Sequence, residues 1–336
     1  MTSRRTLPLA SALLGIVLTA TACSGGDSGG DDTATQDEAF SPEKVDFVVH
    51  TSPGGGSDLF ARQVSELLTS EDLAGRWLVR NENGGSGASA MAFLRGLEGQ
   101  DDTIAVSTPT WLTTPLTNAE AAVTIDQLTP IAQMVTEPTI MAVKGDAPYE
   151  SIEDFIAAAK SDPGGLVQTG GSVTAIDAIA GEIIQKEAGV EWQYLSFEGG
   201  GERIAAVLGG DADMIFAAPA EISEQVRAGD LKVIATIGEE PSALFPDAPT
   251  LSEAGLEQPV PQQVRGIVGP PEMPEQAVEY YASTLEELTE TEAWATYAEE
   301  NGLTTVFQDS EEWGATLEEQ KTLLETTLGE LDLLAK

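Results

Sequence analysis

The sequence predicts an α/β fold for the body of the chain, from about residue 44 to residue 336. Short apolar runs alternate there with longer amphipathic segments, which is the pattern of strands followed by helices. Turns rich in glycine follow several of the predicted strands. The hydrophobic share of 41% is ordinary for a soluble fold, and the length suits one large domain or two medium ones.

The first block of the body holds three predicted strands, and glycine-rich turns lead from the first two into helices. Ser57 is a natural N-cap for the first of these helices, which carries apolar residues from Leu59 to Leu68. The strands are expected at residues 45–50, 77–80 and 103–107, and the two turns at 51–56 and 81–87.

A second block with the same alternation begins near residue 146. Its predicted helices lie at 152–160, 176–187 and 202–208, and its predicted strands at 165–168, 192–197, 212–216 and 232–236. A last strand at 264–269 and two helices at 275–289 and 310–334 complete the pattern.

The N-terminal segment has the features of an export signal. Arg4 and Arg5 form a short basic region, and an apolar stretch from Leu9 to Leu18 is too short to span a bilayer unaided. Cys23 directly follows small residues. The arrangement resembles a bacterial lipoprotein signal at residues 1–22, after which Cys23 is lipidated. A plain secretory signal with an incidental cysteine is the alternative, and the export route, Sec or twin-arginine, stays open.

Residues 23–43 read as a flexible acidic tether of glycine, serine and aspartate. A calcium loop is disfavoured, because the aspartates do not have the spacing of a helix-flanked calcium loop. We therefore expect a lipid-anchored protein at the extracytoplasmic face of the cell membrane.

The charge balance excludes one class of partner. The chain has 16 basic and 56 acidic residues, a formal net charge of −40. Nucleic-acid binding needs clustered Lys and Arg to neutralise phosphates, so it is excluded. The favoured interpretation of the acids is a solvated surface that keeps the protein soluble.

The same inventory limits the chemistry. His50 is the single histidine, so a Ser–His–Asp triad could only be built around it. Cys23 is the single cysteine, so no disulfide and no zinc site of the common types is expected. We expect no metal and no cofactor. Composition leaves paired-carboxylate catalysis open, although no pair stands out.

Three glycine-rich turns, at 53–58, 81–87 and 170–174, lead from a strand into a helix. Glycine lets a ligand approach the backbone closely, and a helix N-terminus offers unpaired N–H groups and a partial positive charge. Such turns suit an anionic group. A dinucleotide site at 84–87 is disfavoured, because the full glycine spacing is missing. Ser57 and Ser86 lack the elbow motif of a nucleophile.

These turns carry a family resemblance. Residues 47–58 resemble the first strand and loop of the solute receptors of tripartite tricarboxylate transporters, the TctC or Bug family, and residues 81–87 resemble the second loop. The resemblance continues in order through 169–172, 197–202, 208–213, 246–255 and 265–271, and so covers nearly the whole mature chain.

The resemblance implies a two-lobed, periplasmic-binding-protein-like fold of type II, with lobes joined by crossing strands. Lobe 1 would comprise 44–145 and 237–336, and lobe 2 would comprise 146–236. The lobes would close on a small organic carboxylate, of the di- or tricarboxylic acid class, for delivery to integral-membrane transporter subunits. The residues that the resemblance places at the ligand are Pro53, Gly54, Gly55, Gly56, Ser57, Asp58, Gly84, Gly85, Ser86, Gly87, Thr108, Thr110, Trp111, Gly170, Gly171, Ser172, Thr174 and Asp177.

The chain departs from the family in its loops. Thr174-Ala175 and Asp177-Ala178 stand where many relatives have Gly-Ser and Asp-His. The identity of the ligand is therefore not transferred. We expect a solute-binding lipoprotein without enzymatic activity. The alternatives are a carboxylate-dependent hydrolase or lyase on the same scaffold, and an acidic surface lipoprotein that makes only protein contacts.

Overall fold

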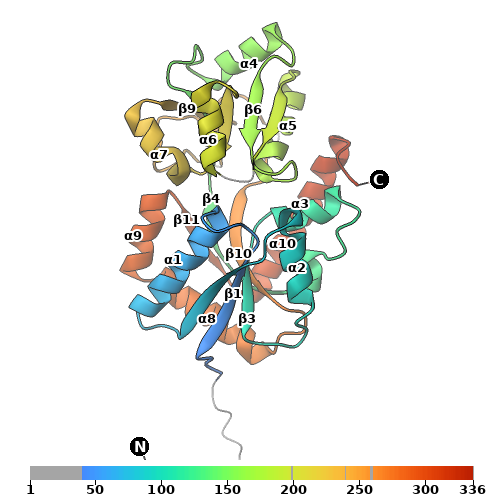
Figure 1. The fold of residues 1–336 in the computed structure, drawn as a ribbon, viewed down its shortest axis with the longest axis vertical. Coiled ribbons are helices and arrows are strands. Elements are labelled where there is room, and N and C mark those ends of the chain that lie inside the picture. The colour runs from blue at the N-terminus through green and yellow to red at the C-terminus, as the bar shows by residue number, and fades with distance from the viewer. Residues whose placement is uncertain (1–39, 198–199, 239, 258–259, 336) are drawn as a thin grey trace, which may run out of the picture. The chain divides into compact units, whose positions relative to one another are not determined.

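The computed structural model describes residues 40–197, 200–238, 240–257 and 260–335. The expected signal at 1–22, the expected lipidation site at Cys23 and most of the tether lie outside the described residues. The described chain forms two β-sheets with helices packed against them, which confirms the predicted α/β class (Figure 1). No helix in these ranges has the length and apolar character needed to cross a membrane.

The larger sheet has six strands in the order β11-β4-β10-β3-β1-β2. Strands β1, β2 and β3 pair in parallel, so the loops after them leave from one edge of the sheet. Strand β10 is antiparallel to β3 and β4, and β11 is antiparallel to β4. The strands are β1 (Lys44–Val49), β2 (Arg76–Asn81), β3 (Thr103–Ser107), β4 (Thr129–Glu137), β10 (Gln263–Gly269) and β11 (Thr304–Gln308).

Both faces of the larger sheet are buried. One face packs Phe47 and Phe60 with the fully buried Tyr281 and Trp294. The other face packs Val48 and Ala105 beneath two buried tryptophans. The surrounding helices are α1 (Gly56–Ser70), η1 (Gly85–Gly87), α2 (Ala88–Arg95), α3 (Thr110–Thr117), η2 (Ile125–Gln127), α8 (Glu275–Thr289), α9 (Glu292–Asn301) and α10 (Ser310–Glu330).

The smaller sheet has five strands in the order β7-β6-β8-β5-β9. Strand β6 is parallel to β7 and β8, and β5 is antiparallel to β8 and β9. The strands are β5 (Thr139–Lys144), β6 (Val167–Gly170), β7 (Gln193–Ser196), β8 (Met214–Ala217) and β9 (Leu231–Ile237). The helices are α4 (Ile152–Ser161), α5 (Ile176–Ala188), α6 (Gly200–Gly209) and α7 (Pro219–Ala228).

The chain crosses between the sheets at Pro138, because β4 ends at Glu137 in the larger sheet and β5 begins at Thr139 in the smaller one. The predicted lobe boundary, after residue 145, lies about seven residues later than this crossing. The smaller lobe comprises the smaller sheet and helices α4 to α7, and the larger lobe comprises the larger sheet and its helices. The chain returns between β9 and β10, and Leu251 and Leu256 of this connection pack in the core of the smaller lobe. Two sheets joined by crossing strands confirm the predicted two-lobed fold.

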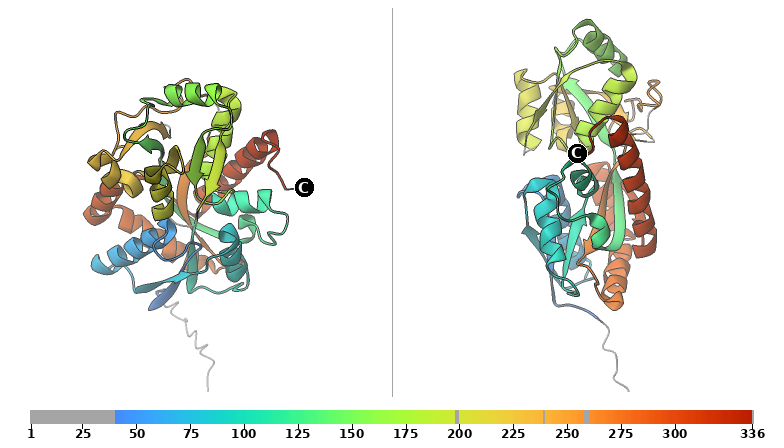
Figure 2. Two further views of the ribbon diagram at one scale, coloured as in Figure 1. Left: turned by 45° about the horizontal axis from the view of Figure 1, so that its top comes forward. Right: turned by 90° about the vertical axis from the view of Figure 1, so that its right-hand side faces the viewer.

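The lobes are in contact on the side of α5. Ile176, Ile179 and Ile183 of α5 belong to the same buried cluster as Trp313 and Leu324 of α10. Figure 2 shows α10 running along the larger lobe to this junction. The contact is apolar along most of its length, so it holds one side of the junction together.

Candidate functional site

The predicted ligand residues come from loops at the carboxyl ends of parallel strands. The loops after β1, β2 and β3 leave neighbouring strands of the larger sheet. The loop after β6, residues 171–175, leaves the smaller sheet. In open α/β sheets this is the edge where ligands bind. Thr174 of the smaller lobe accepts a hydrogen bond at its backbone oxygen from the Thr113 hydroxyl of α3. Loops from both lobes are therefore brought together.

The first loop is held in place by its own aspartate. Asp58 accepts hydrogen bonds from the Gly54 N–H (2.9 Å), the Arg62 guanidinium (2.8 and 2.9 Å) and the Asn81 amide (2.9 Å). Burial alone would raise the pKa of Asp58, but these hydrogen bonds outweigh it and lower the pKa from 3.8 to about 2. Asp58 is 1% exposed, so its carboxylate shapes the loop from behind.

The first turn of α1 leaves backbone donors for a ligand. Among the described residues, none accepts a hydrogen bond from the backbone N–H of Gly56 or Ser57. The Gly54 N–H, by contrast, is bound by Asp58. Unpaired N–H groups at a helix N-terminus favour an anion. Gly56 is exposed and Ser57 is 2% exposed, so the Gly56 backbone, and not the serine hydroxyl, is open to a ligand.

A buried ion pair lies beneath this turn. Arg265 Nη2 is 2.6 Å from Glu137 Oε2, and both side chains are 9% exposed. Arg265 Nη1 is 3.5 Å from the Ser57 hydroxyl, and a Cβ on Gly56 would be 3.1 Å from Nη2. The glycine therefore lets the α1 backbone approach the guanidinium. Arg265 begins the 265–271 segment of the family resemblance, but nothing in the local sequence indicates that β10 passes under α1.

The second loop adopts a left-handed backbone at four consecutive residues, Gly84, Gly85, Ser86 and Gly87, with φ of 131°, 57°, 52° and 94°. At Gly87 a Cβ would also lie 3.0 Å from the Trp111 indole nitrogen. Trp111 is fully buried and Thr108 is 6% exposed. Trp111 supports the loop from behind, and neither the Trp111 nor the Thr108 side chain forms an open wall. Thr110 is half-buried.

The loop of the smaller lobe is also held by an internal carboxylate. Asp177 accepts hydrogen bonds from the Gly171 N–H (2.7 Å) and the Ala178 N–H (2.9 Å). A Cβ on Gly170 would collide with this carboxylate and with the Tyr194 hydroxyl, so only glycine fits. The Ser172 hydroxyl is 2.9 Å from the Thr174 hydroxyl. Ser172 and Thr174 remain half-buried at the loop surface.

Arg203 of α6 connects two acids of the smaller lobe. Its Nη2 is 2.7 Å from Glu221 Oε1, and its Nη1 is 3.6 Å from Asp177 Oδ2. Burial raises the pKa of Asp177, and the charge of Arg203 opposes that rise. Burial also raises the pKa of Glu221, and the negative charge of Glu137 in the other lobe adds to this shift. The charges of the two lobes are thus coupled at the junction.

The single histidine is a weak base in this structure. Burial, followed by the charge of Arg265, lowers the pKa of His50 from 6.5 to about 4. The imidazole is therefore neutral near pH 7. Its ring packs edge-on against Trp111, with ring centroids 5.8 Å apart. In the described ranges, no group of three or more His, Cys, Asp or Glu is placed to hold a metal ion.

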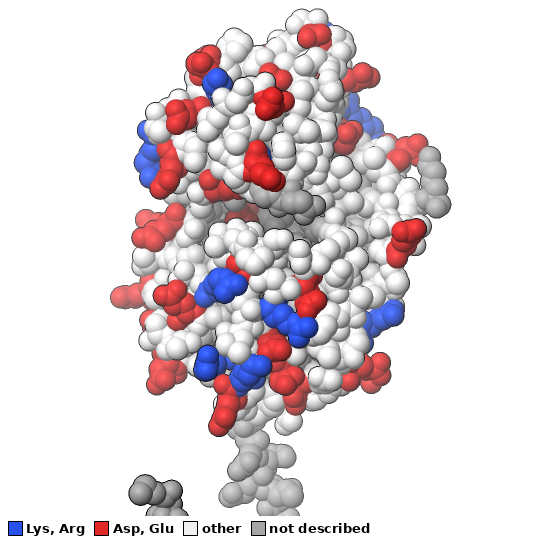
Figure 3. Space-filling model, viewed as in Figure 1, with Lys and Arg blue, Asp and Glu red and all other residues white. Residues whose placement is uncertain are grey.

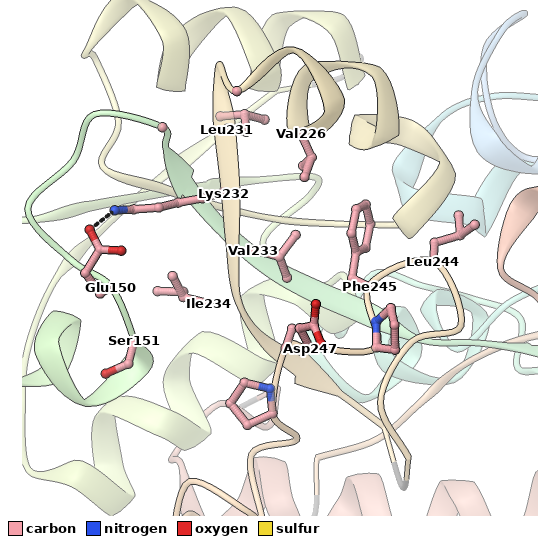
Figure 4. Close-up of a pocket in the computed structure, with 15 residues that line it drawn as sticks. Glu150, Ser151, Val226, Leu231, Lys232, Val233, Ile234, Leu244, Phe245 and Asp247 are labelled. Carbon is pink, nitrogen blue, oxygen red and sulfur yellow. Dashed lines mark hydrogen bonds and ion pairs between the residues drawn. The ribbon is translucent and has the colours of Figure 1, made fainter.

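Figure 3 shows acidic side chains spread over both lobes and a hollowed surface between them. A separate pocket of about 500 Å³ lies along β9, away from every predicted ligand residue. Figure 4 shows Val233 and Phe245 on its walls and the Lys232–Glu150 ion pair (2.5 Å) at one end. The candidate site therefore rests on the loops between the lobes and not on this pocket.

Comparisons with known proteins agree with this architecture. Residues 60–330 match the family described as "Tripartite tricarboxylate transporter family receptor". A UPF0065 protein from Cupriavidus necator is 27% identical over 223 residues, which cover 66% of this chain and 67% of the relative. The periplasmic binding protein BugD superimposes with a TM-score of 0.80 at 18% identity, covering 88% of this chain and all of that one. A protein from R. palustris, solved with adipate, gives the same TM-score and identity, covering 87% and 98% of the two chains.

Proposed function

The chain belongs to the tripartite tricarboxylate transporter receptor family, and from this premise we propose that it captures a di- or tricarboxylate between its lobes. It is a receptor and not an enzyme. The observation that carries the proposal is the unpaired N–H pair of Gly56 and Ser57 directly above the Arg265 guanidinium. The adipate bound by a protein of the same fold supports this ligand class.

In this proposal one carboxylate binds at the first turn of α1, where the helix N-terminus and Arg265 both favour negative charge. Ser172 and Thr174 of the smaller lobe supply hydroxyl donors from the opposite side. The aspartates Asp58 and Asp177 do not contact the ligand directly. They hold the two loops open for it, because each binds the N–H of its own loop.

The cellular location of the protein and its membrane partner are also part of the proposal. The family works outside the cytoplasm, and its name implies a membrane transporter as partner. We place the receptor at the extracytoplasmic face, anchored through lipid on Cys23, where it passes the ligand to integral-membrane subunits. One acyl chain gives only marginal membrane binding, so the mature form should carry more than one.

The test is a thermal-shift and calorimetry screen of small carboxylic acids against the purified soluble domain. A ligand that binds only the folded state raises the melting temperature. We expect one or more acids, with adipate and malate as first probes, to bind, and their diamides not to bind. Turnover of an added acid would contradict the receptor assignment. Equal binding of acids and diamides would contradict the role given to the α1 turn and Arg265.

A further inference from the structure

Buried polar atoms without a protein partner gather in one place in the larger lobe. Ten buried side-chain nitrogen or oxygen atoms of the described residues have no hydrogen-bond partner. Six of the ten come from one face of the larger sheet and from α3 and α10, which cover it. Because buried polar groups are nearly always paired, such a gathering needs a physical explanation. The six atoms are His50 Nδ1, Ser107 Oγ, Trp111 Nε1, Gln133 Oε1, Gln308 Oε1 and Trp313 Nε1.

Strand register places these residues in a row across the larger sheet. Gly266 of β10 pairs with Ser107 of β3 on one side and with Gln133 of β4 on the other. Gln308 of β11 in turn pairs with Gln133. Directly paired residues of antiparallel strands point to the same face, so these side chains share one face. His50 continues the row, because Val48 pairs with Ala105 two residues before it.

Two indole N–H groups reach this row from above. A Cβ on Gly266 would lie 2.8 Å from the Trp313 indole nitrogen, so the nitrogen sits over the centre of the row. Trp111 lies edge-on to His50 at the other end, with ring centroids 5.8 Å apart. Both tryptophans are at most 1% exposed, and Ser107 and Gln133 are 1% and 3% exposed.

The donors and acceptors of the row are mixed and uncharged. Two indoles donate, the two amide oxygens accept, the Ser107 hydroxyl does both, and His50 Nδ1 donates or accepts according to the tautomer of the ring. A bare cation would face two N–H donors, and an anion would face two amide oxygens inside a chain of charge −40. Water donates and accepts, and a buried water needs two to four polar partners.

We propose that this row is a hydration site that binds ordered water between His50, Ser107, Gln133 and the indoles of Trp111 and Trp313. The site does not depend on the identity of the transported ligand. It supports the ligand loops from below, since His50 directly precedes the first loop and Trp111 lies against Gly87 of the second.

A crystal structure of the ligand-free protein tests the proposal directly. We expect water oxygens within about 2.7–3.2 Å of at least two of the six atoms. Side chains that pair directly with one another, with no water between them, would overturn it. Crystals soaked in bromide separate water from an anion, because an anomalous peak in the row would assign a halide site instead.

The sign of a stability change gives a second test. Gln133→Met removes polar atoms from a shape of similar size. If water pairs the amide, the melting temperature should fall by about 2–4 °C. If the amide is unpaired and dry, the temperature should rise, and the proposal fails. Thr236→Val is the matched control, because Thr236 has a single unpartnered hydroxyl in the smaller lobe and is fully buried. Its melting temperature should stay unchanged or rise.

Discussion

Mutation of the buried Arg265–Glu137 pair tests how the region beneath the first turn of α1 is stabilised. We expect Glu137→Leu alone to destabilise the protein strongly, because it leaves the Arg265 guanidinium buried without a counter-ion. Replacing both residues, as Arg265→Met with Glu137→Leu, should recover most of the loss. The pair would then matter for local charge and geometry more than for net stability.

The magnitude follows from the geometry. At the observed 2.6 Å, two unit charges attract by about 6 kcal/mol at an effective dielectric constant of about 20. Desolvation costs several kcal/mol for each ion, so the two effects nearly cancel and the pair contributes little net stability. Removing one partner loses the attraction, while the other charge stays buried and still carries its desolvation cost. This single change should cost about 3–5 kcal/mol, and the double change about 0–1 kcal/mol.

Urea unfolding of the wild type, both single variants and the double variant completes a double-mutant cycle. Asp146→Ala is the control, because the Lys144–Asp146 pair is 3.9 Å apart and exposed at 43% and 80%. It should change stability by less than about 0.5 kcal/mol. The reasoning is refuted if Glu137→Leu costs as little as the control, or if the double variant is as unstable as the single one.

Three further predictions concern the loops and the anchor. Asp58→Asn should destabilise the protein by about 2 kcal/mol near neutral pH, because the folded-state pKa of Asp58 is lowered to about 2. That stabilisation is present above the unfolded-state pKa of 3.8 and is lost as pH falls through about 2. The urea unfolding midpoints of the variant and the wild type should therefore converge in acid. A difference between the midpoints that does not change with pH would contradict this prediction. Gly170→Ala should abolish ligand binding in calorimetry, since its Cβ meets Asp177, whereas Gly201→Ala, with open space at its Cβ, should bind normally. Cys23→Ser should move the protein out of the membrane fraction, and unchanged fractionation would exclude the lipid anchor.

Much of the fold could be read from local pattern. Predicted helices at 152–160 and 275–289 agree with α4 and α8, because each has a clear amphipathic period and a defined start. Strands β4 and β5 were missed. Residues 129–144 hold short apolar stretches broken by Gln133 and by residues 136–139, and such short stretches do not by themselves distinguish a buried strand from a buried helix. Pro138 separates β4 from β5, and only the tertiary structure shows that the two strands belong to different sheets.

The candidate site was predictable as a set of loops but not as a set of contacts. Glycine-rich turns after strands indicate where the backbone can meet a ligand, and the structure brings those turns to one edge of each sheet. The sequence could not show that Asp58 and Asp177 bind the N–H groups of their own loops. It also could not show that Trp111 is fully buried, or that Arg265 lies under α1 from about 200 residues away. These depend on register and packing between distant segments.

Because isoleucines of α5 pack with α10, opening of the junction between the lobes should depend on temperature. Any motion that separates these helices would expose Ile176, Ile179 and Ile183 to water, and exposing apolar surface raises the heat capacity. Apolar association weakens on cooling, so opening along this seam should become easier in the cold. Ligand capture that re-forms the seam would then carry a negative heat-capacity change. The growth temperature of the cell would therefore affect the lifetime of the receptor–ligand complex.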